Sequence, residues 1–187
     1  MIDLFDLAYL GRGSERQRDA LRAIESLGLW HDLAEHTPAL AGTVPLGVDV
    51  EGSDLDVICR ADDLSAFAER IRGLYGGREV FRCACCTVRG VESVVAGFRA
   101  EGWAFELFAQ RAVVADQYAC RHLVAEARLL ALGGDAAREA VRALKRQGVK
   151  TEPAFARHFG IGGDPYEELA RLAWATDEEL RGAVGRL

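Results

Sequence analysis

The chain has 187 residues, half of them hydrophobic and 28% charged, which is the balance of an ordinary globular protein. Lys and Arg number 23 against 29 Asp and Glu, a net charge of −6, so a general nucleic-acid coating role, which needs a basic surface, is not expected. The apolar content also excludes a disordered chain, and the glycines follow no collagen-like period.

The expected location is the cytoplasm, with no membrane association. The chain begins without the features of a secretory signal, and no run of about 18 apolar residues predicts a membrane span. Five cysteines, an odd number, predict reduced thiols rather than a disulfide framework. Cys83, Cys85 and Cys86 lack the paired spacing of structural zinc sites, and in a strand Cys86 would point away from the other two. We therefore expect core thiols there.

The first part of the chain predicts helices mixed with short strands. Ser14 and Gln17 form a capping-box pair, and Asp62 or Asp63 is placed to cap a later helix with an apolar face. In chain order, the expected elements are a helix over 14–28, a short helix over 30–36, strands over 38–41 and 55–59, and a helix from about 63 to 74.

Three closely spaced strands and then only helices are expected in the remainder. Short connections at 89–90 and 101–102 predict antiparallel pairing. The expected elements are strands over 80–88, 91–98 and 103–109, and helices over 117–132, 136–147, 166–175 and 177–184. The predicted fold class is α/β (α+β), a mixed sheet with flanking helices, divided into a catalytic lobe at 1–112 and a helical C-terminal lobe at 113–187.

The segment around Asp54 carries the most informative chemistry. Asp54 and Asp56 are two residues apart at the start of a predicted strand, so both side chains project from one face, while Leu55 and Val57 anchor the other face. Neighbouring carboxylates repel each other unless a cation lies between them, and Mg²⁺ typically takes one or two carboxylates together with substrate phosphates. The pair thus suits Mg²⁺; the alternative is a solvated turn before a strand.

Two other pieces would complete a site for phosphoryl transfer. Gly42 and Thr43 follow a predicted strand at the expected entry to a short helix, where a phosphate can approach the backbone and meet N–H groups and a hydroxyl. Glu106 has strongly apolar neighbours, and a buried carboxylate there needs a cation or a proton to accept. The alternative for Glu106 is a pairing with an arginine.

These pieces together resemble the nucleotidyltransferase superfamily related to DNA polymerase beta. The resemblance consists of Ala41-Gly42-Thr43, a spacer of about ten residues, Asp54-Leu55-Asp56-Val57, and a later apolar strand that carries an acid; it covers about 14–110. Two later phrases, Lys150-Thr151-Glu152-Pro153 and Gly163-Asp164-Pro165-Tyr166, are similar to a bacterial set of uncharacterised domains. The small aminoglycoside and lincosamide nucleotidyltransferases are similar in scale and layout.

The resemblance implies roles for individual residues. The catalytic and metal-binding acids would be Asp54, Asp56 and Glu106, and the nucleotide would contact Gly42, Thr43 and Ser53. Thr43 stands where serine is commoner in the superfamily, and Pro45 restricts the backbone of the residue before it.

A triphosphate also needs positive charge, which the motif does not supply. Lys145 and Lys150 belong to a basic ridge at helical spacing, and we expect both to contact the phosphates; the alternative is a solvated helix face. Arg121 or His122, at the start of the first C-terminal helix, would lie at the mouth of the nucleotide cleft, or else on an ordinary helix surface.

The sequence therefore predicts a Mg²⁺-dependent nucleotidyltransferase with one or two metal ions. It would move a nucleoside monophosphate from an NTP, with ATP the expected donor, to a hydroxyl of a small-molecule acceptor, and acidic charge around the cleft would favour a cationic one. The alternative is a non-catalytic nucleotide-binding or interaction module on the same fold. A nucleotide hydrolase is the least favoured hypothesis.

Overall fold

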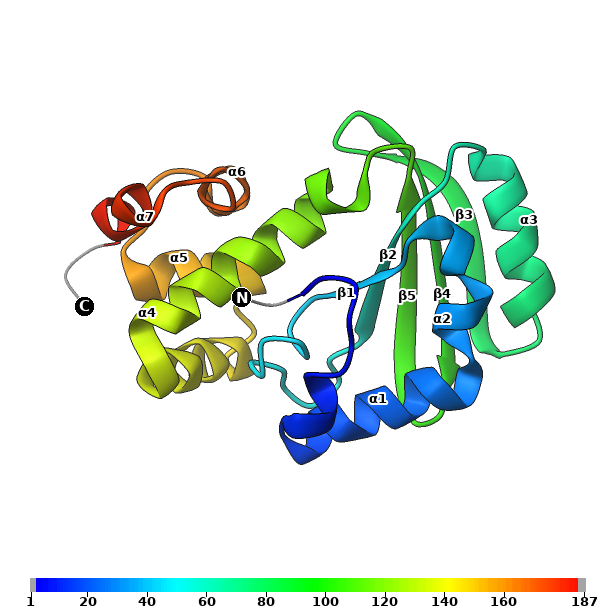
Figure 1. The fold of residues 1–187 in the computed structure, drawn as a ribbon, viewed down its shortest axis with the longest axis horizontal. Helices are drawn as coiled ribbons and strands as arrows, with labels where there is room; N and C mark the ends of the chain where they lie inside the picture. The colour runs from blue at the N-terminus through cyan, green and yellow to red at the C-terminus, as the bar shows by residue number, and fades with distance from the viewer. Residues whose placement is uncertain (1–2, 185–187) are drawn as a thin grey trace.

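A five-stranded mixed sheet forms the centre of the structure, a computed structural model that describes residues 3–184. The strand order is β1-β2-β5-β4-β3 (Figure 1). Strands β2 and β5 run parallel, and the other neighbouring pairs are antiparallel. The strands are β1 (Ala39–Ala41), β2 (Leu55–Arg60), β3 (Glu79–Val88), β4 (Val91–Ala100) and β5 (Trp103–Gln110). The predicted fold class and the antiparallel pairing of β3, β4 and β5 are confirmed.

Three helices and the largest hydrophobic core cover one face of the sheet. They are α1 (Glu15–Leu27), α2 (Leu29–Asp32) and α3 (Leu64–Tyr75), with short 3-10 turns at Leu10–Arg12 and Ala34–His36. The predicted capping box is present, since the Ser14 hydroxyl accepts from the Gln17 N–H and the Gln17 side chain accepts from the Ser14 N–H. Gly28 ends α1 with φ 65°, a conformation that favours glycine.

The helices after β5 pack around a second hydrophobic core. A 3-10 turn (Val114–Asp116) leads into α4 (Tyr118–Arg146), followed by α5 (Thr151–Phe159), α6 (Pro165–Leu172) and α7 (Asp177–Ala183). Figure 1 shows α4 running from the sheet to these helices. Within α4, Gly134 has φ 61° and ψ −154°, which breaks the helix where the sequence predicts two helices. Helix α5 is missing from the sequence prediction, which leaves 151–159 without an element.

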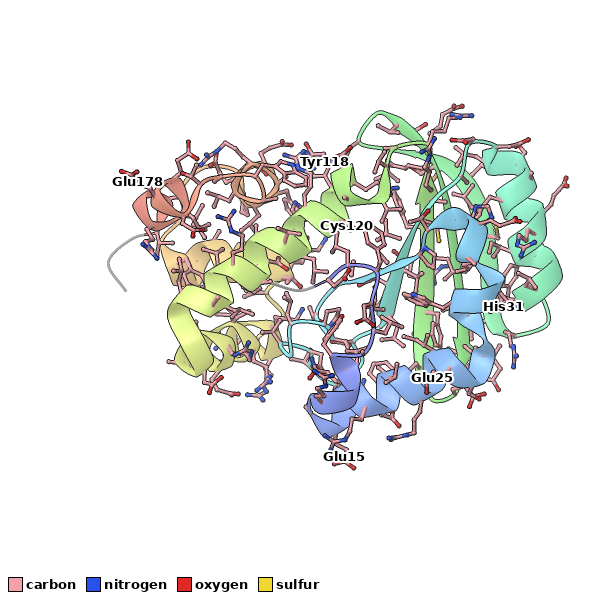
Figure 2. All side chains as sticks on the ribbon, in the orientation of Figure 1. Glu15, Glu25, His31, Tyr118, Cys120 and Glu178 are labelled. Carbon is pink, nitrogen blue, oxygen red and sulfur yellow. The ribbon has the colours of Figure 1, made fainter. Side chains whose placement is uncertain are left out.

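A third, smaller core joins the two parts. Ala39 and Ile58 from the sheet pack with Val114 and with Cys120, which is fully buried. Figure 2 shows Cys120 near the start of α4, next to the sheet. The Gln117 amide donates to the carbonyl oxygens of Cys59 (2.9 Å) and Ala112 (3.1 Å), so β2 and the start of α4 are fixed to each other.

The cysteines are free thiols, as predicted. Cys85 and Cys86 are exposed, however, and Cys83 is only partly buried, so the expectation of core thiols is wrong for Cys85 and Cys86. The buried thiols are Cys59 and Cys120. Strand β3 lies at the edge of the sheet, where its side chains have fewer neighbours. Across residues 3–184, no helix has both the length and the apolar character needed to cross a membrane.

Phe105 provides a test of the first core. It is 2% exposed and stacks on Phe98 with ring centroids 5.1 Å apart. Replacing Phe105 with Ala leaves a cavity, and we expect a loss of about 3–5 kcal/mol in the free energy of unfolding, measured by urea denaturation. Phe5→Ala is the matched control, because Phe5 is 45% exposed and its loss should cost far less. Equal effects of the two substitutions would contradict this packing.

Candidate active site

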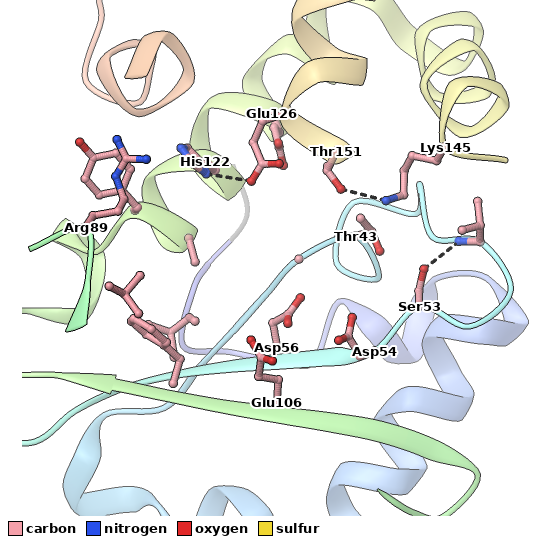
Figure 3. Close-up of a pocket in the computed structure, with 18 of the residues that line it drawn as sticks. Thr43, Ser53, Asp54, Asp56, Arg89, Glu106, His122, Glu126, Lys145 and Thr151 are labelled. Atoms are coloured by element: carbon pink, nitrogen blue, oxygen red, sulfur yellow. Dashed lines mark hydrogen bonds and ion pairs between the residues drawn. The ribbon is translucent and has the colours of Figure 1, made fainter. Parts of the chain in front are cut away.

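A cavity of about 1090 Å³ lies between the sheet and the C-terminal helices. Its lining brings together the end of β1, the loop before β2, the exposed face of β5 and the inner face of α4 (Figure 3). The predicted site residues that line it are Gly42, Thr43, Ser53, Asp54, Asp56, Glu106, Lys145 and His122. Segments more than 90 residues apart in the sequence therefore meet at one place.

Strand alternation places the acidic side chains on the cavity face. Leu55 and Val57 are fully buried in the first core, so the intervening Asp56 points the other way. Asp56 pairs in register with Glu106 on the parallel neighbour β5. Asp54 directly precedes β2 and is exposed. The predicted common face of the two aspartates and the convergence with Glu106 are both present (Figure 3).

The carboxylates perturb one another. Burial, followed by the charges of Asp54 and Glu106, raises the pKa of Asp56 from 3.8 to about 7. Burial and Asp54 also raise the pKa of Glu106, while Arg82 opposes that shift. The Arg82 guanidinium lies 3.5 Å from Glu106 and reaches it across Gly97, which separates the two residues in the sheet register. Glu106 is therefore not the isolated buried acid that its neighbours predict: its side chain is 36% exposed and has an arginine partner.

Gly42 is required by its conformation and by its neighbour. Its φ is +76°, and a Cβ at this position would collide with Oδ2 of Asp56. The segment after it is a turn rather than the predicted short helix: Gly47 donates to the Val44 carbonyl (3.0 Å) and Val48 to that of Thr43 (3.2 Å). The expected helix N-terminus is thus absent here, and a phosphate would meet the Gly42 backbone and the Thr43 side chain.

The basic ridge of α4 has a more specific role than a solvated face. Arg138 donates to the Leu46 carbonyl (3.1 Å) and Arg142 donates to the Gly47 carbonyl, so both tie the turn after β1 to α4. Lys145 lines the cavity and donates to the Thr151 hydroxyl at 2.8 Å. Lys150 is exposed at the start of α5 and is not among the lining residues, so the structure does not bring it to the predicted phosphate site.

Two acidic residues of the cavity, Glu126 and Glu152, were not predicted from the sequence, whereas their neighbour His122 was. Glu126, on α4, is 3% exposed, and burial followed by the charge of Glu152 raises its pKa well above the usual value. His122 uses Nε2 to donate to the Tyr166 carbonyl (2.8 Å), and its Nδ1 lies 3.2 Å from Glu152. Although burial opposes ionisation of Glu152, the hydrogen bond with His122 lowers its pKa. Ala119, His122 and Glu126 are three and four residues apart, so they share one face of α4. This spacing was the signal in the sequence that could have placed Glu126 in the cavity with His122.

The hairpin between β3 and β4 closes the far end of the cavity. Arg89, in the turn of this hairpin, forms an ion pair with Glu167 of α6, and its guanidinium lies 4.4 Å from the centroid of the Tyr118 ring. The Tyr118 hydroxyl also donates to Glu167 at 2.9 Å. Arg121, the other candidate for the cleft mouth, instead donates to the Ala170 carbonyl and so joins α4 to α6.

The donor set at Asp54, Asp56 and Glu106 fits Mg²⁺ in its chemistry. All three offer carboxylate oxygens, and their mutual repulsion is what a cation would relieve. Among residues 3–184, however, no three His, Cys, Asp or Glu side chains are arranged as a ready-made metal site. An ion held here would need additional oxygen ligands, and substrate phosphates commonly supply them.

The fold is shared with solved poly(U) polymerase and GLD-2 structures. Solved structures similar to this chain include a Cid1 poly(U) polymerase bound to MgGTP, with a TM-score of 0.54 and 10% identity over 87% of this chain and 53% of that one. The GLD-2/RNP-8 complex gives a TM-score of 0.55 and 12% identity over 96% of this chain and 76% of that one. The chain thus spans about half the length of the Cid1 structure that it matches.

The sequence pattern of a family described as a domain of unknown function, DUF4269, matches residues 22–172. The chain belongs to that family. No curated protein matches the sequence.

The burial of Asp56 predicts a pH dependence of stability. A carboxyl whose pKa rises from 3.8 to about 7 on folding stays protonated to a higher pH in the folded protein than in the unfolded chain. Because the folded state then binds more protons, the free energy of unfolding falls as the pH rises between these two values. In EDTA, Asp56→Asn should therefore stabilise the protein by about 2–4 kcal/mol at pH 8, and the gain should shrink toward pH 5. Thermal denaturation at pH 8 and at pH 5 measures the gain in stability at each pH. Asp135→Asn is the control: its side chain is fully exposed, so the substitution should change the stability little at either pH. A gain that does not depend on pH would contradict the raised pKa.

Proposed function

We propose that the protein is a Mg²⁺-dependent nucleotidyltransferase that uses an NTP, with ATP the expected donor. The observation that carries the proposal is the convergence of Asp54, Asp56 and Glu106 in one cavity with the Gly42 turn, on a nucleotidyltransferase fold. Two structural neighbours of this fold were solved with MgGTP and with MgATP. At 10–12% identity these neighbours support the fold alone, so the activity rests on the residues.

Each group has a distinct task in this proposal. Asp54 and Asp56 hold the metal, and Glu106 is either a third ligand or the acceptor of a proton. Gly42 lets the triphosphate approach the backbone, and the Thr43 hydroxyl and the Lys145 ammonium contact its oxygens. Bound Mg²⁺ supplies neutralisation of the phosphate charge.

The reaction is a displacement at the α-phosphorus of the NTP. The acceptor oxygen forms a bond to this phosphorus while the bond to the bridging oxygen of the β-phosphate breaks, and that oxygen leaves with its electron pair as part of pyrophosphate. The acceptor hydroxyl loses its proton, for which Glu106 is a suitable acceptor. Lys145 offers positive charge to the departing pyrophosphate.

The charge of the cavity supports a cationic small molecule as the acceptor. Seven acidic residues line it, against two basic ones, Arg89 and Lys145, and the single histidine. Three of the acids serve the metal, and Arg89 is already paired with Glu167. The acidic excess of the lining as a whole, rather than of the residues left after these pairings, supports an amine-bearing acceptor over a nucleic-acid backbone.

Nucleotide binding tests the site directly. Each of the four NTPs is added to the protein with and without Mg²⁺, and the melting temperature is measured. At 100 times its Kd, a ligand adds about 2.7 kcal/mol of stability, which corresponds to a shift of several degrees. We expect a Mg²⁺-dependent shift that is lost in the Asp54→Asn/Asp56→Asn double variant and kept in Asp135→Asn. A shift that survives the double variant would place the nucleotide elsewhere.

Pyrophosphate release tests turnover and the acceptor class. We expect release from the NTP that binds, stimulated by amine-bearing hydroxyl compounds such as amino sugars, and abolished by Asp54→Asn. RNA oligonucleotides with a free 3′ hydroxyl form the comparison arm, because they carry the opposite charge. Pyrophosphate release that is stimulated by RNA and not by the amine-bearing compounds would overturn the proposal of a cationic acceptor, while the proposed nucleotidyltransferase activity would stand. Nucleotide binding without pyrophosphate from any acceptor would favour the non-catalytic module, and release of monophosphate would indicate a hydrolase.

A further inference from the structure

Glu126 on α4 is a buried acid for which the proposed reaction gives no use. Its side chain lines the cavity and is 3% exposed. Its Oε1 is sealed from solvent and has no hydrogen-bond partner in the described part of the chain. Buried polar atoms are nearly always hydrogen-bonded, and leaving one unpaired is costly. A ligand that donates a hydrogen bond to this oxygen would remove the cost.

No neighbour of Glu126 in the described part of the chain donates a hydrogen bond to its Oε1, and the polar groups closest in charge to it have other partners. Lys145 donates to the Thr151 hydroxyl at 2.8 Å. Glu152 lies 3.2 Å from Nδ1 of His122, and Nε2 of the same ring donates to a backbone carbonyl. Figure 3 shows Glu126 beside this pair, with its carboxyl group at the cavity. One oxygen of this carboxyl group thus lacks a partner, and rotation about the terminal bond of the side chain, which is a soft torsion, would present it to a ligand in the cavity.

The position of Glu126 along the cavity indicates which part of a nucleotide it would meet. On one side lie Lys145 and Thr43, the proposed phosphate contacts. On the other side, toward the start of α4, the lining includes the apolar residues Ile58 and Phe108, beside the Arg89–Glu167 pair. Since α4 rises about 1.5 Å per residue, Glu126 is roughly 10 Å along the helix from Ala119, at that apolar end. A sugar placed between phosphates and a base would therefore lie against Glu126.

We propose that Glu126 binds a ribose hydroxyl of the NTP and so selects ribonucleotides over deoxyribonucleotides. A hydroxyl is a hydrogen-bond donor that fits an unpaired carboxyl oxygen, and a sugar without it leaves that oxygen unsatisfied. The proposal rests on the proposed function, since it assumes that the phosphates bind beside Gly42 and Lys145.

The test compares binding of a ribonucleotide with that of its 2′-deoxy and 3′-deoxy forms, in the presence of Mg²⁺, by isothermal titration calorimetry. The ribonucleotide is ATP, or whichever NTP binds the wild-type protein best. We expect the wild type to bind it about tenfold more tightly than at least one deoxy form. Glu126→Leu should lower the affinity for the ribonucleotide to that of the deoxy form and leave deoxy binding unchanged.

Two further variants separate recognition from structure. Glu126→Gln keeps an acceptor oxygen and should retain most of the discrimination. Glu51→Gln changes an exposed acid in the lining of the same cavity and should leave the ratio of affinities unchanged. If circular dichroism shows that Glu126→Leu does not fold, the proposal is tested by the ratio of ribonucleotide to deoxyribonucleotide affinity in the wild type and in Glu126→Gln.

Equal wild-type affinities for the ribonucleotide and both deoxy forms would overturn the role of Glu126. Discrimination that persists in Glu126→Leu would also overturn it. In both cases nucleotide binding itself, and with it the proposed function, would stand. Failure of all four NTPs to bind the wild type would instead overturn the proposed function and this inference together.

Discussion

The parallel pairing of β2 with β5 holds two like charges side by side, and the rest of the site depends on this constraint. Asp56 and Glu106 are register partners, and the apolar residues that alternate with them are anchored in the first core. The backbones therefore cannot separate to relieve the repulsion between the carboxylates. A proton or a cation relieves the repulsion. In the protein alone, burial, together with the charges of Asp54 and Glu106, raises the pKa of Asp56 and so favours the proton.

The turn after β1 links this acidic pair to the opposite wall of the cavity. Gly42 passes so close to Asp56 that no side chain fits, and the same turn is held by Arg138 and Arg142 from α4. The turn after β1 and α4 are thus coupled by hydrogen bonds, in addition to the packing around Cys120. A ligand that contacts both walls would meet a site whose parts are already fixed relative to each other.

Local pattern was enough to predict the acids but not their surroundings. Alternation in a strand, with Leu55 and Val57 inward, places Asp54 and Asp56 on one face whatever the rest of the chain does. The partner of Glu106 depends instead on register across β4, which brings Arg82 over Gly97 to β5, and no short-range signal encodes that. Glu126 and Glu152 were missed because a glutamate in a helix is ordinarily exposed, and only the packing of α5 and α6 against α4 buries them. Lys150 was predicted to contact the phosphates because of its spacing from Lys145 on one helix face. Helix α4 ends at Arg146, before Lys150, so the two lysines do not share a helix face.

The charge of the cavity separates what the fold implies from what the residues imply. The fold is shared with Cid1 and GLD-2 structures, the first described as a poly(U) polymerase, and that likeness taken alone would suggest an RNA acceptor. The lining carries seven acids against two basic residues, and this excess makes a polyanion a poorer fit than a cation. Folds are reused across substrates, whereas the electrostatics of a site act directly on whatever enters it. The proposal of a cationic small-molecule acceptor therefore rests on the charge of the lining and not on the likeness in fold.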